Sequence, residues 1–134
     1  MPVLINDVPV VCINQAAVAN HVSAALVLSI MKKENGRNGQ AVRNKDGTFD
    51  LGVFQINTRW LPTLARHGYT RDDLQFNPCK NVMAATWILA TNLAEGKTLW
   101  SAIGNYHSHT LKHNLTYRAS VQANYQKITQ VLQI

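Results

Sequence analysis

The sequence predicts a single domain built almost entirely from α-helices, with room for one short β element. The chain has 134 residues, of which 46% are hydrophobic. That is enough to bury one core but too little for two domains. Long apolar-rich segments are separated by glycine, asparagine and proline stops, and no internal repeat, low-complexity segment or linker divides the chain. Together these observations favour an all-α or α-dominated small domain.

Most of the predicted helices lie next to residues that favour helix ends. The first predicted helix stops before Asn35 and Gly36, which form a common C-terminal signal. Pro78 lies near the first turn of a later helix, and Thr98 can cap the one that follows it. In chain order, the predicted helices cover residues 16–33, 58–67, 79–94, 99–106 and 115–132.

Between these helices the chain contains typical loop residues. Residues 36–50 combine glycines with Asn and Lys and include a Lys-Asp-Gly turn at 45–47, so we expect a loop there. Residues 51–57 are expected to form a short strand or an extended entry into the next helix. Glu-Gly-Lys at 95–97 is expected to end the helix before it.

The charge is positive but scattered, with 13 Lys and Arg against 7 Asp and Glu and a formal net charge of +6. Nucleic-acid binding would need a basic face with interleaved aromatic residues, and no such motif is present. We therefore expect no nucleic-acid partner and a mildly basic surface suited to an acidic polymer. The longest apolar run, 24–31, is interrupted by Ser29 and is shorter than the roughly 18 residues that span a membrane.

Cys12 and Cys79 are the only cysteines, and two interpretations are open. Free buried cysteines are common. A disulfide between them would instead contribute about 4 kcal/mol in the chain-entropy model and indicate an oxidising compartment. The start, MPVLINDVPVVC, lacks the basic and long apolar regions of a signal peptide. Either the protein is made without one, or this is a mature domain with an added Met. The cysteines favour the second, and with it a periplasmic or secreted location.

Glu34 ends the first predicted helix on its apolar face. Residues three, four and seven positions back on a helix share one face, and for Glu34 these are Met31, Ile30 and Val27. Glutamate is rarely buried without a partner. A carboxyl held against apolar walls has a raised pKa, because desolvation disfavours its anion. The pattern therefore indicates a general acid at the edge of a cleft.

Other interpretations of the carboxylates stay open. Glu34 could swing into solvent, or pair with Arg37 or Arg43. Most glycosidases use two carboxylates, and the nearest second candidates are Asp46 and Asp50. Asp46 is typical of a turn residue, and Asp50 is expected to hold the loop.

Three segments resemble the signature segments of SLT-type lytic transglycosylases, which are lysozyme-like enzymes that cleave peptidoglycan. They are ENG at 34–36, NKDGTFDLGVFQIN at 44–57 and AIGNYHS at 102–108. The sequence is most similar to the small single-domain members that accompany conjugation, secretion and pilus machines. In those members NxxGxxDxGxxQIN recurs together with a cysteine before the first helix and an NPCxN cysteine. The resemblance covers roughly residues 12–109.

The resemblance implies a lysozyme-like fold for residues 1–134, with 1–11 as an N-terminal extension and the active-site cleft at the end of the first long helix. It also implies that Cys12 and Cys79 are bonded and that Glu34 is the catalytic acid. Asn35 replaces the usual serine, and His107 replaces a common asparagine. The expected substrate-binding residues are Asn35, Asn44, Asp50, Phe54, Gln55, Asn57, Tyr106 and His107.

The implied reaction uses one carboxyl. Glu34 protonates the glycosidic oxygen between MurNAc and GlcNAc, the N-acetyl group stabilises the cation at C1, and the C6 hydroxyl closes on C1 to form a 1,6-anhydro sugar. Phe54, Trp60 and Tyr106 are candidate platforms for sugar rings, and Trp87 is expected in the core. We expect no cofactor, a monomer, and as partners peptidoglycan strands and components of a secretion, conjugation or pilus apparatus.

Three alternatives remain. The same site could belong to a lysozyme-type hydrolase of the same bond, or to a glycan-binding scaffold subunit of a secretion apparatus that has no catalytic activity. A metal site could use His107, His109 and His113, but their spacing matches no zinc pattern and we expect no metal.

Overall fold

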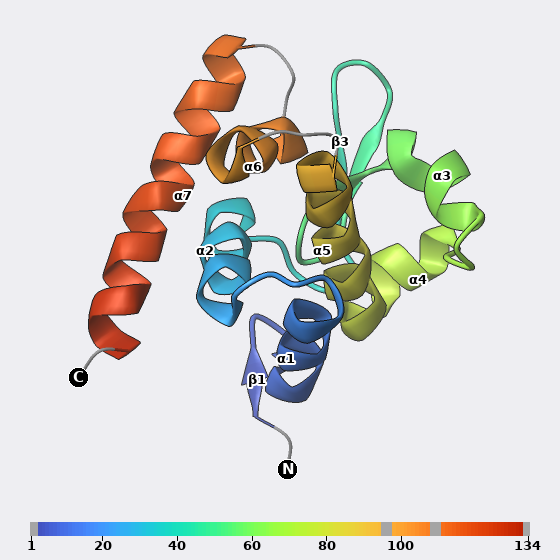
Figure 1. Cartoon of the computed structure of the whole chain (residues 1–134). Helices are drawn as coiled ribbons and strands as arrows, with labels where there is room; N and C mark the ends of the chain where they lie inside the picture. The colour runs from blue at the N-terminus through green and yellow to red at the C-terminus, as the bar shows by residue number, and fades with distance from the viewer. Residues whose placement is uncertain (1–2, 95–97, 108–110, 133–134) are drawn as a thin grey trace.

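The α-dominated fold expected from the sequence is confirmed by the computed structural model, which describes residues 3–94, 98–107 and 111–132. Figure 1 shows α5 near the centre of the molecule, with α3 and α4 on one side and the long α7 along the other. The helices are α1 (Val10–Ala19), α2 (Ala24–Glu34), the 3-10 helix η1 (Thr58–Trp60), α3 (Leu61–Ala65), α4 (Arg71–Phe76), α5 (Pro78–Ala94), α6 (Leu99–His107) and α7 (Leu111–Leu132).

The single helix predicted over residues 16–33 is wrong, because the chain forms α1 and α2 instead, bent by 117° from each other. Asn20 ends α1, and His21 adopts a left-handed φ of 55°. Ser23 then starts α2 by accepting a hydrogen bond from the Leu26 amide at 3.2 Å. The apolar pattern continues across this break, and so it does not reveal the bend.

The loop predicted over residues 36–50 contains an antiparallel hairpin of β3 (Ala41–Arg43) and β4 (Phe49–Leu51), which β5 (Ile56–Asn57) extends to a small sheet. The turn expected at 45–47 is present. Asp46 accepts hydrogen bonds from the amide and hydroxyl of Thr48 at 3.0 and 2.6 Å. Gly47 has a φ of 86°, a conformation that glycine adopts readily.

The later helices agree more closely with the prediction. Helices α5 and α6 form where expected, while α7 begins at Leu111, earlier than the predicted start at 115. The segment 58–67 is divided between η1 and α3. Helix α4 is missing from the prediction although Thr70 and Asp73 form a capping box at its start. The helix break expected at 95–97 lies outside the described residues.

Within the described N-terminal residues, β2 (Val8–Pro9) packs onto the rest of the domain. Strands β1 (Leu4–Ile5) and β2 form a hairpin, and Val8 is completely buried where β2 contacts α1 and α5. Cys12 in α1 and Cys79 in α5 form a disulfide with their Cα atoms 5.3 Å apart, which confirms the pairing that the resemblance implied. The disulfide therefore ties the start of the chain to the central helix.

Within the described part of the chain, no single helix combines the length and apolar character needed to cross a membrane. The bent pair α1 and α2 meets the criterion only when its two helices are counted together. Residues of α2, of α5 and of the segment after β4 contribute to one hydrophobic core. It contains Val27, Ile30, Phe54, Ile88 and Leu89, each 3% exposed or less.

Candidate active site

Glu34 is the last residue of α2, on the face that packs into the core. Val27, Ile30 and Met31, which precede it on the same face, are 1%, 3% and 1% exposed. The helix ends directly after Glu34 because Asn35 adopts a left-handed φ of 53°. The carboxyl group therefore continues an apolar stripe and is the first polar group where that stripe reaches the surface.

The hydroxyl group of Tyr117 on α7 donates a hydrogen bond of 2.6 Å to Oε2 of Glu34. The pKa of Glu34 is raised to about 7, mainly by burial and to a lesser degree by the negative charge of Asp50, while Tyr117 and Lys33 act to lower it. The proposed pairing of Glu34 with Arg37 is wrong, because Arg37 forms an ion pair of 2.7 Å with Asp7. At neutral pH the carboxyl of Glu34 is thus poised to lose or gain a proton.

Glu34 opens into a cleft of about 220 Å³ between the small sheet and the helical part of the domain. The cleft contains both acidic and amide side chains, as well as one arginine and one tryptophan. Its lining consists of Glu34, Asn44, Asp46, Thr48, Asp50, Gln55, Ile56, Asn57, Arg59, Trp60, Ile88, Tyr106 and His107. Most of the residues that the sequence predicted as substrate-binding are therefore gathered around Glu34.

The segment after Glu34 and the turn that carries Gln55 meet at Gly36. The Gly36 amide donates to the Val53 carbonyl at 3.1 Å. A Cβ atom on residue 36 would collide with the carbonyl oxygens of Gly52 and Val53 and approach Nε2 of Gln55. Gln55 itself has a φ of 51°, and its Nε2 donates to the Gly52 carbonyl at 2.9 Å. The missing side chain of Gly36 thus allows these two segments to approach.

A hydrogen-bond network holds the opposite wall of the cleft. Asn44 and Asn57 donate to the Thr48 hydroxyl at 3.1 and 2.9 Å, and Asn57 also donates to Asp50 at 3.0 Å. Asp50 therefore faces Glu34 from a strand whose neighbours fix its position. The wall is polar and its side chains are hydrogen-bonded to one another, which suits recognition of sugar hydroxyl and amide groups.

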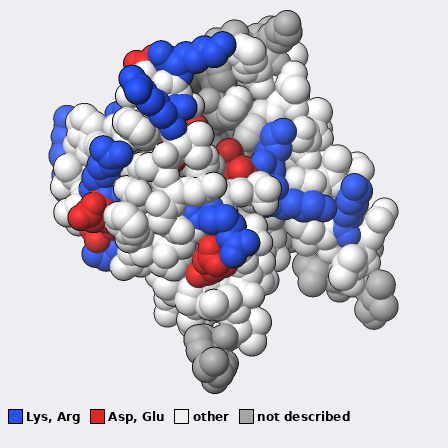
Figure 2. Space-filling view, turned by 180° about the vertical axis from the view of Figure 1, so that it is seen from behind, with Lys and Arg blue, Asp and Glu red and all other residues white. Residues whose placement is uncertain are grey.

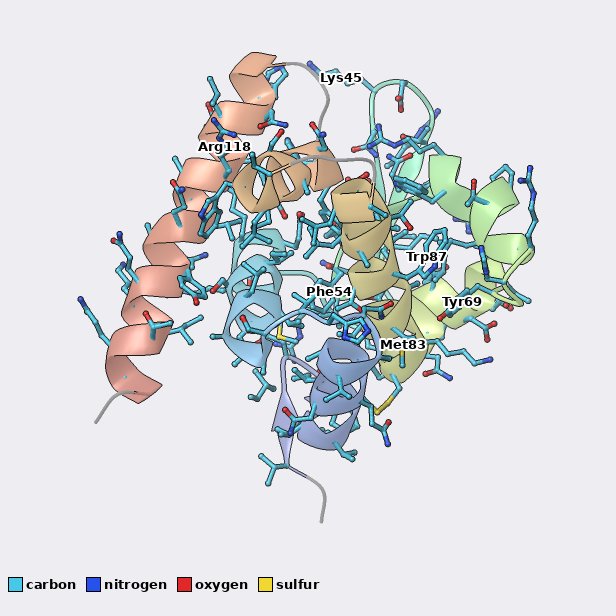
Figure 3. All side chains as sticks on the ribbon, in the orientation of Figure 1. Lys45, Phe54, Tyr69, Met83, Trp87 and Arg118 are labelled. Carbon is cyan, nitrogen blue, oxygen red and sulfur yellow. A yellow bond between two sulfur atoms is a disulfide. The ribbon has the colours of Figure 1, made fainter. Side chains whose placement is uncertain are left out.

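Two of the expected sugar platforms are not open rings. Phe54 is 1% exposed and lies in the interior near α5 (Figure 3). Its ring is therefore not placed to contact a ligand in the cleft. Tyr106 borders the cleft but is 8% exposed, and its hydroxyl donates to the Phe54 carbonyl at 2.9 Å. Trp60 is half-buried and lines the cleft. Trp87 packs against the core, 4.5 Å from the ring of His67.

Asn35 and His107 replace common family residues and have different positions. Asn35 is exposed, has a left-handed φ of 53°, and is not among the residues that line the cleft. It is therefore not placed to bind substrate. His107 lines the cleft, and its ring stacks on Tyr117 with centroids 4.8 Å apart. Burial lowers the pKa of His107, which favours the neutral imidazole.

Tyr117 and Arg59 are site residues that sequence reasoning missed. Tyr117 lies 83 positions after Glu34, and its neighbours match none of the segments that carried the resemblance. One signal was available, since Tyr117 and Val121 are four residues apart on α7 and both are buried. A buried tyrosine hydroxyl needs a hydrogen-bond partner. That argument indicates a polar contact without identifying Glu34.

The described residues contain no group of three His, Cys, Asp or Glu side chains that could hold a metal ion. His109, one of the three histidines considered for such a site, lies outside the described residues. Lys and Arg side chains are scattered over the face in Figure 2 with acidic residues among them, as the sequence suggested.

Comparison with known proteins shows the family to which this chain belongs. The family model described as "Transglycosylase SLT domain" matches residues 11–129. "Protein IpgF" of Shigella flexneri is 30% identical over 87% of this chain and 80% of that protein. "Invasion protein IagB" of Salmonella typhi is 26% identical over 90% of this chain and 78% of its own length. "Peptidoglycan-binding-like protein" of Escherichia coli O157:H7 is 29% identical over 80% and 68%, respectively.

Proposed function

This chain belongs to the transglycosylase SLT family, and from that premise we propose that it cleaves the β-1,4 bond between MurNAc and GlcNAc with formation of 1,6-anhydro-MurNAc. We further propose that residues 1–134 act as one catalytic domain. The observation that carries the proposal is the carboxyl of Glu34, which ends a buried helix, opens into a polar cleft and has a pKa near 7.

The proposed reaction uses the Glu34 carboxyl twice. Protonated Glu34 gives its proton to the glycosidic oxygen, the bond from C1 to that oxygen breaks, and GlcNAc leaves with a 4-hydroxyl group. The N-acetyl group of MurNAc stabilises the cation by bonding to C1. The Glu34 anion then takes the proton of the C6 hydroxyl. The oxygen of that hydroxyl attacks C1 and displaces the N-acetyl oxygen. The product is the anhydro sugar, and Glu34 is protonated again.

Tyr117 and Asp50 have supporting roles in this proposal. Tyr117 stabilises the Glu34 anion between the two steps, through the hydrogen bond to Oε2. Asp50 helps to keep Glu34 protonated before the first step, because its charge disfavours a second anion nearby. Asp50 is itself held by Asn57. The proposal assigns it no nucleophilic role.

The products that the protein releases from purified peptidoglycan sacculi test the proposed reaction. Mass spectrometry should detect anhydro-muropeptides after digestion with the wild-type protein, and Glu34→Gln should lower the rate by about 10²- to 10⁴-fold, the usual contribution of a general acid. Asp72→Asn, an exposed carboxylate on α4, is the matched control and should digest normally. Products that carry only reducing ends would instead identify a lysozyme-type hydrolase.

The biological role proposed here is local opening of the cell wall for a secretion, conjugation or pilus apparatus in the periplasm. It rests on the similarity to the invasion protein IagB and to IpgF. A disulfide is typical of an oxidising compartment and supports the same location. If the protein is a scaffold subunit without catalytic activity, Glu34→Gln should leave the apparatus working. If it is an enzyme, the same variant should reduce the assembly or the output of the apparatus.

A further inference from the structure

Among the described residues that line the cleft, Arg59 is the only Lys or Arg. It lies in η1, between β5 and α3, and is followed by Trp60, which also lines the cleft. The amide of Arg59 donates to the side chain of Asn57 at 2.9 Å, so the backbone that carries the guanidinium is held by the same network as the cleft wall. Arg59 is exposed, and its guanidinium is accessible to a ligand.

In the part of the chain that the structure describes, the charge of Arg59 forms no ion pair. Across residues 3–94, 98–107 and 111–132, ion pairs form only between Arg37 and Asp7 and between Lys80 and Asp73. Among the acidic residues of the cleft, Asp46 accepts both hydrogen bonds from Thr48. The hydrogen bonds from Thr48 are the main cause of the lowered pKa of Asp46, and the positive charge of Arg59 lowers it by a smaller amount.

Peptidoglycan carries carboxylates at a defined place. Its sugar backbone is neutral, and its acidic groups lie on the lactyl arm of MurNAc. That arm ends in a carboxylate when the strand has no peptide, or continues into an acidic stem peptide. A planar guanidinium can bind a carboxylate through two parallel hydrogen bonds. The cation of the cleft therefore matches a group found on MurNAc and absent from GlcNAc.

We propose that Arg59 binds a carboxylate on the lactyl arm of MurNAc and so makes the cleft prefer MurNAc-containing strands over neutral GlcNAc polymers. This inference rests on the proposed function, since it names the part of the same substrate that Arg59 recognises. The site has the chemistry needed: Trp60 beside Arg59 offers an apolar surface, and the amides of the wall can bind the neutral sugar groups.

Binding measurements can test this without turnover. Calorimetry in a Glu34→Gln background would compare three ligands: peptide-bearing glycan fragments, the same fragments after amidase removal of the peptides, and chitohexaose, which has no carboxylate. We expect Arg59→Gln to weaken binding of a carboxylate-bearing fragment by about threefold to tenfold. Binding of chitohexaose should stay within error of the parent. The extra affinity of Arg59 should decline at high salt.

Two further variants serve as controls. Arg66→Gln removes the same charge from an exposed position outside the cleft and should leave all three affinities unchanged. Arg59→Lys keeps the charge but cannot form the paired hydrogen bonds, and should recover part of the lost affinity. Thermal melts of each variant verify folding.

The outcomes separate the two carboxylates and separate this inference from the proposed function. A loss confined to peptide-bearing fragments places the carboxylate on the stem peptide, and a loss confined to peptide-free fragments places it on the lactyl group. Equal losses for chitohexaose, or no loss for either carboxylate fragment, would overturn the inference. Anhydro products from the wild-type protein would still support the proposed reaction in that case.

Discussion

At the scale of single residues, Glu34 is set between opposing influences. Burial against the apolar stripe is the largest influence and acts with the charge of Asp50 to raise its pKa, and the net value is about 7. The hydroxyl of Tyr117 acts in the other direction. A group that serves first as an acid and then as a base works best when its pKa is close to the working pH. The balance around Glu34 meets that requirement.

The first prediction concerns Tyr117→Phe, which removes one hydrogen bond and keeps the ring that stacks on His107. Because that bond lowers the pKa of Glu34, its loss should move the alkaline limb of the profile of kcat/KM against pH to higher pH. Tyr125→Phe on the same helix, where the ring packs against Trp100, should not move it. An alkaline limb that stays in place or moves to lower pH in Tyr117→Phe would contradict this assignment.

The second prediction concerns stability against pH. The pKa of Glu34 is about 7 in the folded protein against 4.5 in the unfolded chain. The contribution of this pKa difference to the stability of the fold is therefore complete below pH 4.5 and is lost as the pH rises through about 7. At about 1.4 kcal/mol for each pKa unit the loss is on the order of 3 kcal/mol. Glu34→Gln cannot ionise. Its free energy of unfolding should therefore rise relative to wild type over this range.

Urea unfolding of both proteins across the same pH range measures this difference. If glutamine also lowers the free energy of unfolding by a constant amount, the whole curve of Glu34→Gln is displaced, but its dependence on pH does not change. Asp72→Asn is the control and should follow the wild-type curve. Parallel curves for Glu34→Gln and wild type would show that the carboxyl is not desolvated.

At the scale of elements, the cleft depends on how closely the end of α2 approaches the turn that carries Gln55. Gly36 is the contact point, and its amide is bonded to the Val53 carbonyl at 3.1 Å. The bend between α1 and α2 has a separate role, since it lets α1 reach α5 while α2 runs along α7. The site is therefore built by short connections at both ends of α2.

The third prediction is that Gly36→Ala destabilises the protein by about 1–3 kcal/mol, as expected for overpacking, and lowers turnover of sacculi. The added Cβ would collide with backbone carbonyls of residues 52 and 53, which cannot move aside as a flexible side chain could. Urea unfolding and release of anhydro-muropeptides measure both effects.

Gly68→Ala is the control for this variant. Gly68 has a φ of 87° and no atom near its absent Cβ, so alanine there should cost about 1 kcal/mol through backbone conformation alone. Turnover should remain normal. The packing argument fails if Gly36→Ala is as active and as stable as this control.

At the scale of the whole molecule, distant parts of the chain meet at α5 and α7. Helix α7 packs along α2 and α6 (Figure 1) and brings Tyr117 to Glu34. The disulfide joins Cys12 of α1 to Cys79 at the start of α5. Neither cysteine lines the cleft. The disulfide therefore supports the scaffold, and the packing of α7 completes the site.

The fourth prediction is that the double variant Cys12→Ser, Cys79→Ser loses about 4 kcal/mol of unfolding free energy, because the unfolded chain regains the entropy that the cross-link removes. Urea unfolding measures the loss, and reductant should bring the wild-type protein to the same value. Initial rates under conditions where the variant is folded should match wild type. A variant as stable as the oxidised protein would show that the cross-link adds nothing to stability.

Sequence reasoning succeeded where a local rule links neighbouring residues. Helical spacing alone placed Glu34 on the face of Val27 and Ile30, and that face is buried as predicted. It failed where position depends on the surroundings. Phe54 lies in a segment that was expected to be extended, so its ring could have pointed to the cleft or to the core. Only the packing of the folded domain directs the ring inward. Asn35, at the left-handed end of α2, is exposed and does not line the cleft.

The sequence by itself determined the helical class of the fold, the residue that ends the apolar stripe and, through its signature segments, the family. Only the tertiary structure decided which groups surround that carboxyl. Tyr117 and Glu34 are 83 positions apart, and Tyr106 and Phe54 are 52 apart. Contacts at such separations arise from the packing of whole helices, and periodicity within one helix carries no information about its partner. The carboxyl that we propose as the acid was therefore identifiable from the chain, whereas its proton affinity required the fold.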